Sequence, residues 1–180
     1  MRILFAGIMA RYPFGGVTWC SLMYLLGLRA LGHEVFYVED TGECVYDPVQ
    51  NTRATDPGYG TRYIHNALGP FGLGDRWTFV NYDGSYHGQS ALRLRRFCAD
   101  ADLFLNLSGG SWFWRDEYAR IPHKAFIDSD PAFTQLAIAK AGMSASDQVS
   151  MKVVDSGSAA LEKVMAQNGQ RMDRLERAIS

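Results

Sequence analysis

Residues 2–8 (RILFAGI), 17–31 (VTWCSLMYLLGLRAL) and 34–38 (EVFYV) decide the fold. The first and third segments are short, apolar and rich in branched or aromatic side chains, which favours buried strands. The segment between them is long enough for a helix, and Gly32 follows it where a helix C-cap requires a positive φ. These three segments therefore predict a strand–helix–strand unit with parallel strands.

The same alternation continues along the chain. We expect further strands at residues 77–81, 103–107 and 124–127, and helices at residues 59–68, 89–98 and 131–141. Strands with continuous apolar runs that alternate with helices are typical of a parallel sheet covered on both faces. The sequence thus predicts the α/β class, with a doubly wound, Rossmann-like parallel sheet of about five strands in the order 3-2-1-4-5. The polar residues 39–58 are expected to form a long loop.

The composition changes after Gly142, and no aromatic residue occurs from there to Ser180. We therefore expect one domain over residues 1–142, and a linker and amphipathic helix over residues 143–180 as a C-terminal helical tail. Apolar residues of this tail follow the spacing of a coiled-coil seam. We expect the tail helix either to lie on its own domain or fray in solution, or to form a homodimer through residues 157–180.

Charge and cysteine content exclude several functions. A net charge of −1 gives no general field that would attract nucleic acid. The three cysteines are far apart and lack the close pairs that bind zinc or an iron–sulfur cluster, so we expect a reducing cytoplasm, no metal and no other cofactor. The apolar residues 19–31 are interrupted by Arg29 and are too short for a transmembrane segment.

Ligands of open parallel sheets bind beyond the carboxyl ends of the strands. After the first strand, Arg11, Gly15 and Gly16 precede a helix, whose free N–H groups favour a phosphate or carboxylate, although a glycine pair also serves a tight turn. After the second strand, Glu39 and Asp40 are either a ribose-binding pair or a solvated strand end.

The loop after the third strand carries Asp83 and His87, the two candidate catalytic residues. An imidazole titrates near neutrality and serves as a general base. The alternative is a turn with a surface histidine.

Two further strand ends carry candidate substrate-binding residues. After the fourth strand, Ser108, Gly109 and Gly110 are expected to expose backbone amides beside the aromatic residues Trp112 and Trp114. Aromatic rings stack on sugars, but they also fill cores and interfaces. After the fifth strand, Asp128 and Asp130 could hold Mg²⁺ or Mn²⁺ beside a diphosphate, or one of them could cap the next helix, which is the interpretation we favour.

The chain resembles a known family over residues 1–141. The residues that carry the resemblance to the N-terminal domain of GT-B glycosyltransferases are Met1-Arg2-Ile3-Leu4-Phe5, Gly15-Gly16 and Leu31-Gly32-His33-Glu34-Val35. Tyr82-Asp83-Gly84, His87-Gly88 and Phe126-Ile127-Asp128-Ser129-Asp130-Pro131 are similar to glycosyltransferase-like proteins. Arg11 stands in the loop where inverting members often place a histidine base.

In that family the N-terminal domain binds the acceptor, a second domain binds the nucleotide sugar, and catalysis occurs between them. The resemblance implies a glycosyltransferase-like domain that binds a sugar acceptor for transfer from a nucleotide-sugar donor and needs a separate donor-binding domain. The chain would then be a truncated, frameshifted or naturally split half. The alternative is a non-catalytic, flavodoxin-like binding or assembly module for a small anionic ligand.

Overall fold

The computed structural model describes residues 1–111 and 115–129. Its main sheet has six strands in the order β6-β5-β2-β1-β7-β8. The parallel strands are β1 (Arg2–Ala6), β2 (Glu34–Glu39), β5 (Trp77–Val80), β7 (Leu103–Leu107) and β8 (His123–Ile127), and β6 (Tyr86–Gly88) pairs antiparallel with β5. The predicted order of the five parallel strands is confirmed, and β6 adds an antiparallel edge to a sheet compatible with a Rossmann-like fold.

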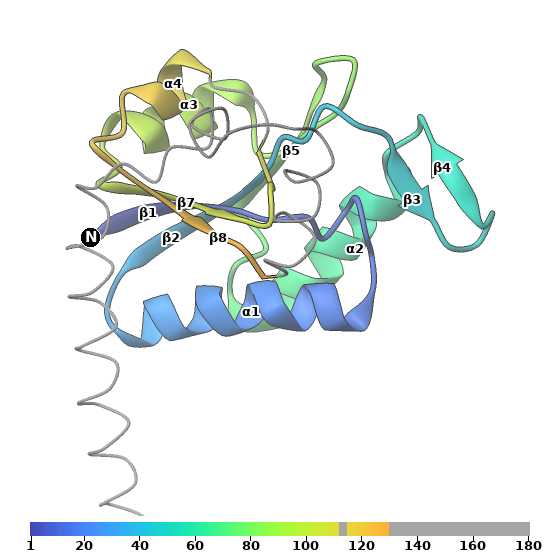
Figure 1. The fold of residues 1–180 in the computed structure, drawn as a ribbon, viewed down its shortest axis with the longest axis horizontal. Coiled ribbons are helices and arrows are strands. Elements are labelled where there is room, and N and C mark those ends of the chain that lie inside the picture. Colours follow the sequence, from blue (N-terminus) through green and yellow to red (C-terminus); the bar gives the residue numbers. More distant parts are fainter. Residues whose placement is uncertain (112–114, 130–180) are drawn as a thin grey trace, which may run out of the picture.

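Helices cover both faces of this sheet (Figure 1). One face carries α1 (Gly15–Ala30) and α2 (Gly58–Leu68), and the 3-10 helix Gly69–Phe71 follows α2. The other face carries α3 (Ala91–Ala99) and α4 (Asp116–Ala119). No helix within residues 1–111 and 115–129 is both long and apolar enough to cross a membrane. The helix expected at residues 131–141, the linker and the tail helix lie outside the described residues.

Alternating side chains of the strands divide the core into two layers. Phe5 of β1 and Tyr37 of β2 lie with α1 and α2, whereas Leu4 and Phe36, one residue earlier in each strand, lie with α3 and α4. All four side chains are at least 98% buried. This two-sided burial explains why the strand sequences are continuously apolar rather than alternating.

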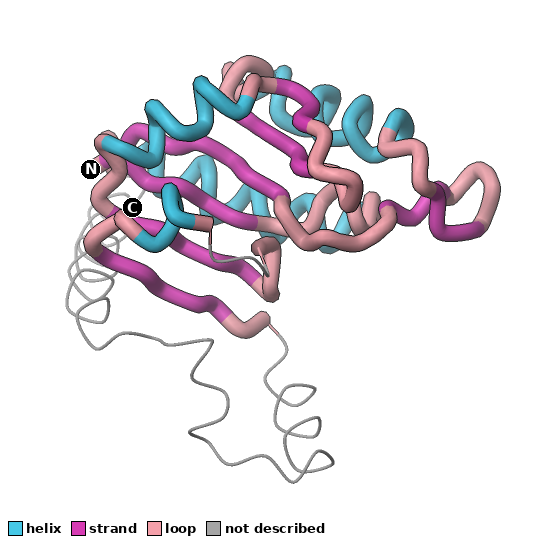
Figure 2. The backbone as a smooth tube through the Cα atoms, turned by 90° about the horizontal axis from the view of Figure 1, so that it is seen from above, coloured by secondary structure: helices cyan, strands magenta, loops and turns pink. Residues whose placement is uncertain are grey.

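The segment after β2 is not the loop that we expected. It contains a second, two-stranded antiparallel sheet of β3 (Val45–Asp47) and β4 (Thr52–Ala54). This hairpin projects from the body of the domain (Figures 1 and 2). Asp47 Oδ1 shapes its tip by accepting hydrogen bonds from the N–H groups of Val49 at 2.8 Å and Gln50 at 3.3 Å, and Asn51 adopts a φ of 53°.

The loop after β7 crosses the end of β1 at very short range. A Cβ atom at Gly110 would lie 2.3 Å from the Gly7 nitrogen and 2.5 Å from the Ala6 carbonyl carbon, which no side chain tolerates. The Gly110 carbonyl also accepts a hydrogen bond from the N–H of Asp40 at 2.9 Å. A glycine is therefore required at position 110, where the ends of β1, β2 and β7 meet.

We predict opposite effects for two Gly→Ala substitutions. Gly110→Ala should lower the free energy of unfolding by about 1–3 kcal/mol, because two backbones must move apart. Gly27→Ala lies inside α1 with nothing within 4 Å of the new methyl group, and should raise that free energy by about 0.5–1 kcal/mol. Urea denaturation of both variants tests this, and equal stability of Gly110→Ala and the wild type would contradict the close contact.

Candidate functional site at the carboxyl edge of the sheet

The loop after β1 is held by a buried carboxylate at the end of β2. Glu39 is fully buried and accepts hydrogen bonds from the N–H groups of Ala10 at 2.8 Å and Arg11 at 2.6 Å, and from the Tyr37 hydroxyl at 2.9 Å. The same tyrosine oxygen accepts the N–H of Met9 at 3.0 Å. Burial raises the pKa of Glu39 to about 7, and the hydrogen bonds from Ala10, Arg11 and Tyr37 partly oppose this rise.

Asp40, the next residue, holds the other side of the edge. Its side chain is 1% exposed, and its carboxylate accepts hydrogen bonds from Arg115 Nε at 2.5 Å, Arg115 Nη2 at 3.0 Å and the Tyr118 hydroxyl at 3.0 Å. This hydrogen-bonded pairing raises the pKa of Arg115, and burial raises the pKa of Tyr118. Glu39 and Asp40 thus form neither a ribose-binding pair nor a solvated strand end, and both expectations are wrong.

Gly15 and Gly16 form the first turn of α1 and are exposed. A Cβ atom at either position would meet nothing within 4 Å, and neither residue has a positive φ. The packing of the chain therefore does not explain why both residues are glycine. The backbone of this turn is open to the approach of another molecule.

An aromatic pair that the sequence analysis missed flanks this turn. Phe14 precedes α1, is 47% exposed, and lies with its ring centroid 5.5 Å from that of Tyr46 in β3. Behind it, the hydroxyl groups of Thr18 and Tyr63 are 2.7 Å apart and join α1 to α2. Only the position of Phe14 directly before the two glycines could have suggested this pair from the sequence.

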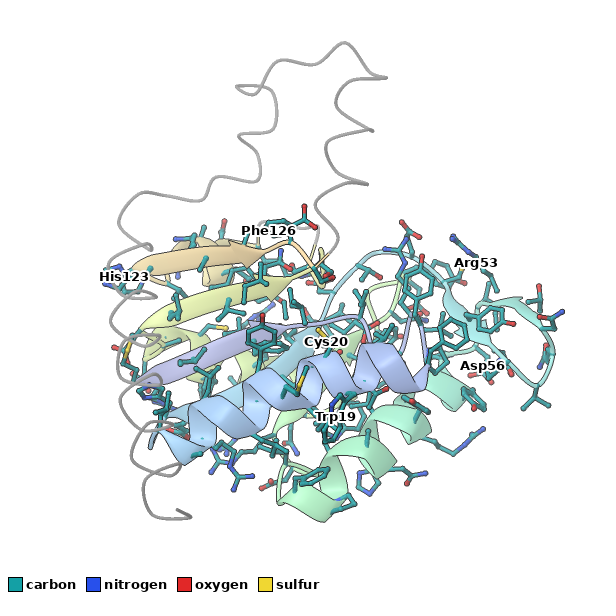
Figure 3. All side chains as sticks on the ribbon, turned by 60° about the horizontal axis from the view of Figure 1, so that its bottom comes forward. Trp19, Cys20, Arg53, Asp56, His123 and Phe126 are labelled. Carbon is teal, nitrogen blue, oxygen red and sulfur yellow. The ribbon has the colours of Figure 1, made fainter. Side chains whose placement is uncertain are left out.

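Arg11 joins the loop after β1 to the projecting hairpin. Its guanidinium forms an ion pair with Glu43, which also pairs at 3.2 Å with Arg53, a residue on the hairpin (Figure 3). The Arg11 guanidinium carbon lies 5.1 Å from the ring centroid of Tyr12. These contacts leave 14% of the Arg11 side chain exposed. The role of Arg11 in ligand binding stays a prediction.

The loop after β7 does not expose the amides expected of it. The N–H groups of Ser108, Gly110 and Ser111 donate to Ile127 O at 2.9 Å, Leu107 O at 3.0 Å and Asn106 Oδ1 at 3.3 Å. Gly109, Gly110 and Ser111 are buried, and consecutive positive φ angles of 52° and 78° at Ser108 and Gly109 form the turn. The expectation of exposed amides is therefore wrong for this loop.

Side chains rather than amides remain accessible at the ends of β7 and β8. The half-buried Ser108 hydroxyl contacts that of Ser129, and Asp128 beside it is half-buried. Trp112, Trp114 and Asp130 lie outside the described residues, so the aromatic platform and the second carboxylate stay predictions.

Asp83 and His87 lie at the far edge of the sheet. Asp83 is in the turn between β5 and β6, and His87 is in β6, the strand four places from β7. Neighbouring strands are about 4.8 Å apart, so β6 and β7 are separated by roughly 19 Å. Asp83 Oδ1 accepts hydrogen bonds from the Ser85 hydroxyl at 2.6 Å and the Ser85 N–H at 2.9 Å, which lower the pKa of Asp83. The structure does not bring this pair to Ser108.

The described residues contain no cluster of three His, Cys, Asp or Glu side chains that could hold a metal ion. No family model matches the chain, and no curated protein or solved structure matches it either. The geometry of the carboxyl edge is therefore the basis for assigning a function.

A pH-dependent stability is expected from Glu39. Its raised pKa means that the folded state binds a proton more tightly than the unfolded chain, so its contribution to stability is present below pH 4.5 and is lost as the pH rises to about 7. The stability advantage of the wild type over Glu39→Gln should shrink by up to about 3 kcal/mol across this range. Urea denaturation at pH 4.5, 6 and 8 measures it, and a constant difference would contradict the raised pKa.

Proposed function

We propose that the chain is a glycosyltransferase-like domain in which the N-terminus of α1 faces the diphosphate of a nucleotide sugar. The observation that carries this proposal is the exposed Gly15–Gly16 turn, where a Cβ atom at either position would meet no other described part of the chain within 4 Å apart from the helix's own backbone and the adjoining residues. The first N–H groups of a helix have no partner within it, and the helix dipole places partial positive charge there. A phosphate group suits both features.

The side chains around the Gly15–Gly16 turn suit the sugar and the nucleobase of a nucleotide sugar. The exposed Phe14 ring, supported by Tyr46, presents an apolar face on which a sugar or a nucleobase can stack. Glu39 fixes the preceding loop through the N–H groups of Ala10 and Arg11, so the turn is preorganised before a ligand binds.

The acceptor belongs, in this proposal, at the ends of β7 and β8. β7 pairs with β1, so the Ser108 hydroxyl and the Asp128 carboxylate lie at the same edge of the sheet as the loop that leads to α1. Hydroxyl and carboxylate oxygens bind sugar hydroxyl groups by hydrogen bonding. A second domain, in this chain or another, would supply the remaining donor contacts.

A non-catalytic binding module is the second candidate function, and the position of Asp83 and His87 favours it. The two candidate catalytic residues are four strands from Ser108. Glu39 and Asp40, the carboxylates that do lie at the carboxyl edge, are buried and hydrogen-bonded within the chain. An anionic ligand could therefore bind at α1 without any group transfer.

The proposed phosphate contact is tested by Gly16→Asp, with Gly27→Ala in the same helix as control. Open space surrounds both positions, so both variants should fold. An aspartate in the first turn favours the helix by about 0.3–1 kcal/mol but repels an anion. At hundredfold excess over Kd, UDP-glucose should stabilise the wild type and Gly27→Ala by about 2.7 kcal/mol and leave Gly16→Asp unchanged, as measured by thermal melting.

The same melting series separates the two candidate functions. Stabilisation by UDP-glucose and also by a simple glycoside supports a sugar-transfer domain. Stabilisation by UDP or inorganic diphosphate alone, with no effect of the glycoside, supports the binding module. Stabilisation of Gly16→Asp equal to that of the wild type would contradict both, because each places the anion at α1.

A further inference from the structure

A cleft of about 290 Å³ opens between α2 and the β6 edge of the sheet. Helix α2 lines it with Arg62, His65 and Asn66, and the sheet lines it with Trp77, His87 and Gly88. None of the residues that form the proposed site at α1 lines this cleft. A volume of this size is near the lower end for small-molecule sites.

The lining of this cleft has cationic and neutral groups only. Arg62 and His65 are exposed. No carboxylate is among the lining residues. An arginine and two imidazoles around one opening complement an anion, and a guanidinium matches the oxygens of a phosphate.

His87 is held in place by a chain of hydrogen bonds. The Ser85 hydroxyl has a single proton, which it donates to Asp83 Oδ1 at 2.6 Å. Its oxygen therefore accepts from His87 Nε2, which lies 3.1 Å away, so this nitrogen carries a proton. This chain of hydrogen bonds fixes the orientation of the imidazole ring beside the cleft.

The wall formed by the sheet is rigid. Trp77 Nε1 donates a hydrogen bond to the Gly74 carbonyl at 3.0 Å, which fixes the indole ring. The Gly88 backbone lies against that ring, because a Cβ atom at Gly88 would be 2.6 Å from two of its carbons, and Gly88 has a φ of 77°. Only glycine meets both requirements, so the edge strand can approach the tryptophan beside the cleft.

We propose that this cleft is a second ligand site, which binds the phosphate group of a small phosphorylated molecule through Arg62, His65 and His87. The proposal goes beyond the function proposed for α1 and does not depend on it, since the two sites share no residue. It also gives Asp83 and His87 a role where the structure places them, as a positioning carboxylate and an anion-binding imidazole.

The four histidines of the chain supply an internal control for the test. His65 and His87 line the cleft, whereas His33 and His123 do not. We would titrate the full chain with inorganic phosphate in 0.15 M NaCl at constant pH and follow the imidazole Hε1 resonances by NMR. The resonances of His65 and His87 should move together and saturate, while those of His33 and His123 stay in place.

Two variants complete the experiment. Arg62→Gln should weaken phosphate binding by about tenfold or more, since a charge-assisted hydrogen bond is lost. Arg96→Gln removes an exposed arginine from α3, on the opposite face of the sheet, and should leave the binding constant unchanged.

Three results would overturn the proposal. They are no shift of His65 and His87, parallel shifts of all four histidines, and equal weakening by the two arginine substitutions. The last two would show that phosphate associates with the surface charge in general. Because Gly16 is not part of the cleft, the Gly16→Asp variant should retain the histidine shifts, so failure of this proposal is distinguishable from failure of the site at α1.

Discussion

Two adjacent buried carboxylates, Glu39 and Asp40, hold the loops at the carboxyl edge of the sheet. A carboxylate that is removed from water is costly unless hydrogen bonds replace its hydration, and both residues receive three. Glu39 orders the loop from β1 to α1, and Asp40 holds Arg115 and Tyr118 at α4. The loop that leads into α1 keeps a defined position because Glu39 binds two of its N–H groups, so the candidate site depends on a residue that is itself fully buried.

The parallel part of the fold could be predicted because each of its strands is a nearly continuous run of apolar residues. Residues 103–107 are buried and apolar at nearly every position, and β7 has the expected bounds. The hairpin β3–β4 and the strand β6 could not be predicted, since three residues are too few to show a period. Individual contacts stabilise the hairpin and β6 instead. Asp47 forms the turn of the hairpin, and Gly88 in β6 leaves space for the Trp77 ring.

The sequence placed the candidate residues at the ends of strands, but it did not predict how those residues are arranged. The rule that ligands bind beyond strand ends drew attention to Gly15 and Gly16, which the structure leaves exposed, and their role in binding stays a prediction. Contacts between residues that are distant in sequence determine how the loops at this edge are arranged. Gly110 packs on Gly7, and Asp40 pairs with Arg115. His87 is the clearest case, because its segment pairs back on β5 instead of continuing over the sheet, which removes it from the site expected for it.

The central claim is that the N-terminus of α1 binds the phosphate of a nucleotide sugar. Backbone amide NMR of the ¹⁵N-labelled chain during a titration with UDP-glucose tests it most directly, because the atoms proposed to donate are observed one by one. We expect the amide resonances of Gly15 and Gly16 to move most, with smaller changes in the loop that precedes them. Resonances that stay fixed at both glycines while others shift and saturate would contradict it.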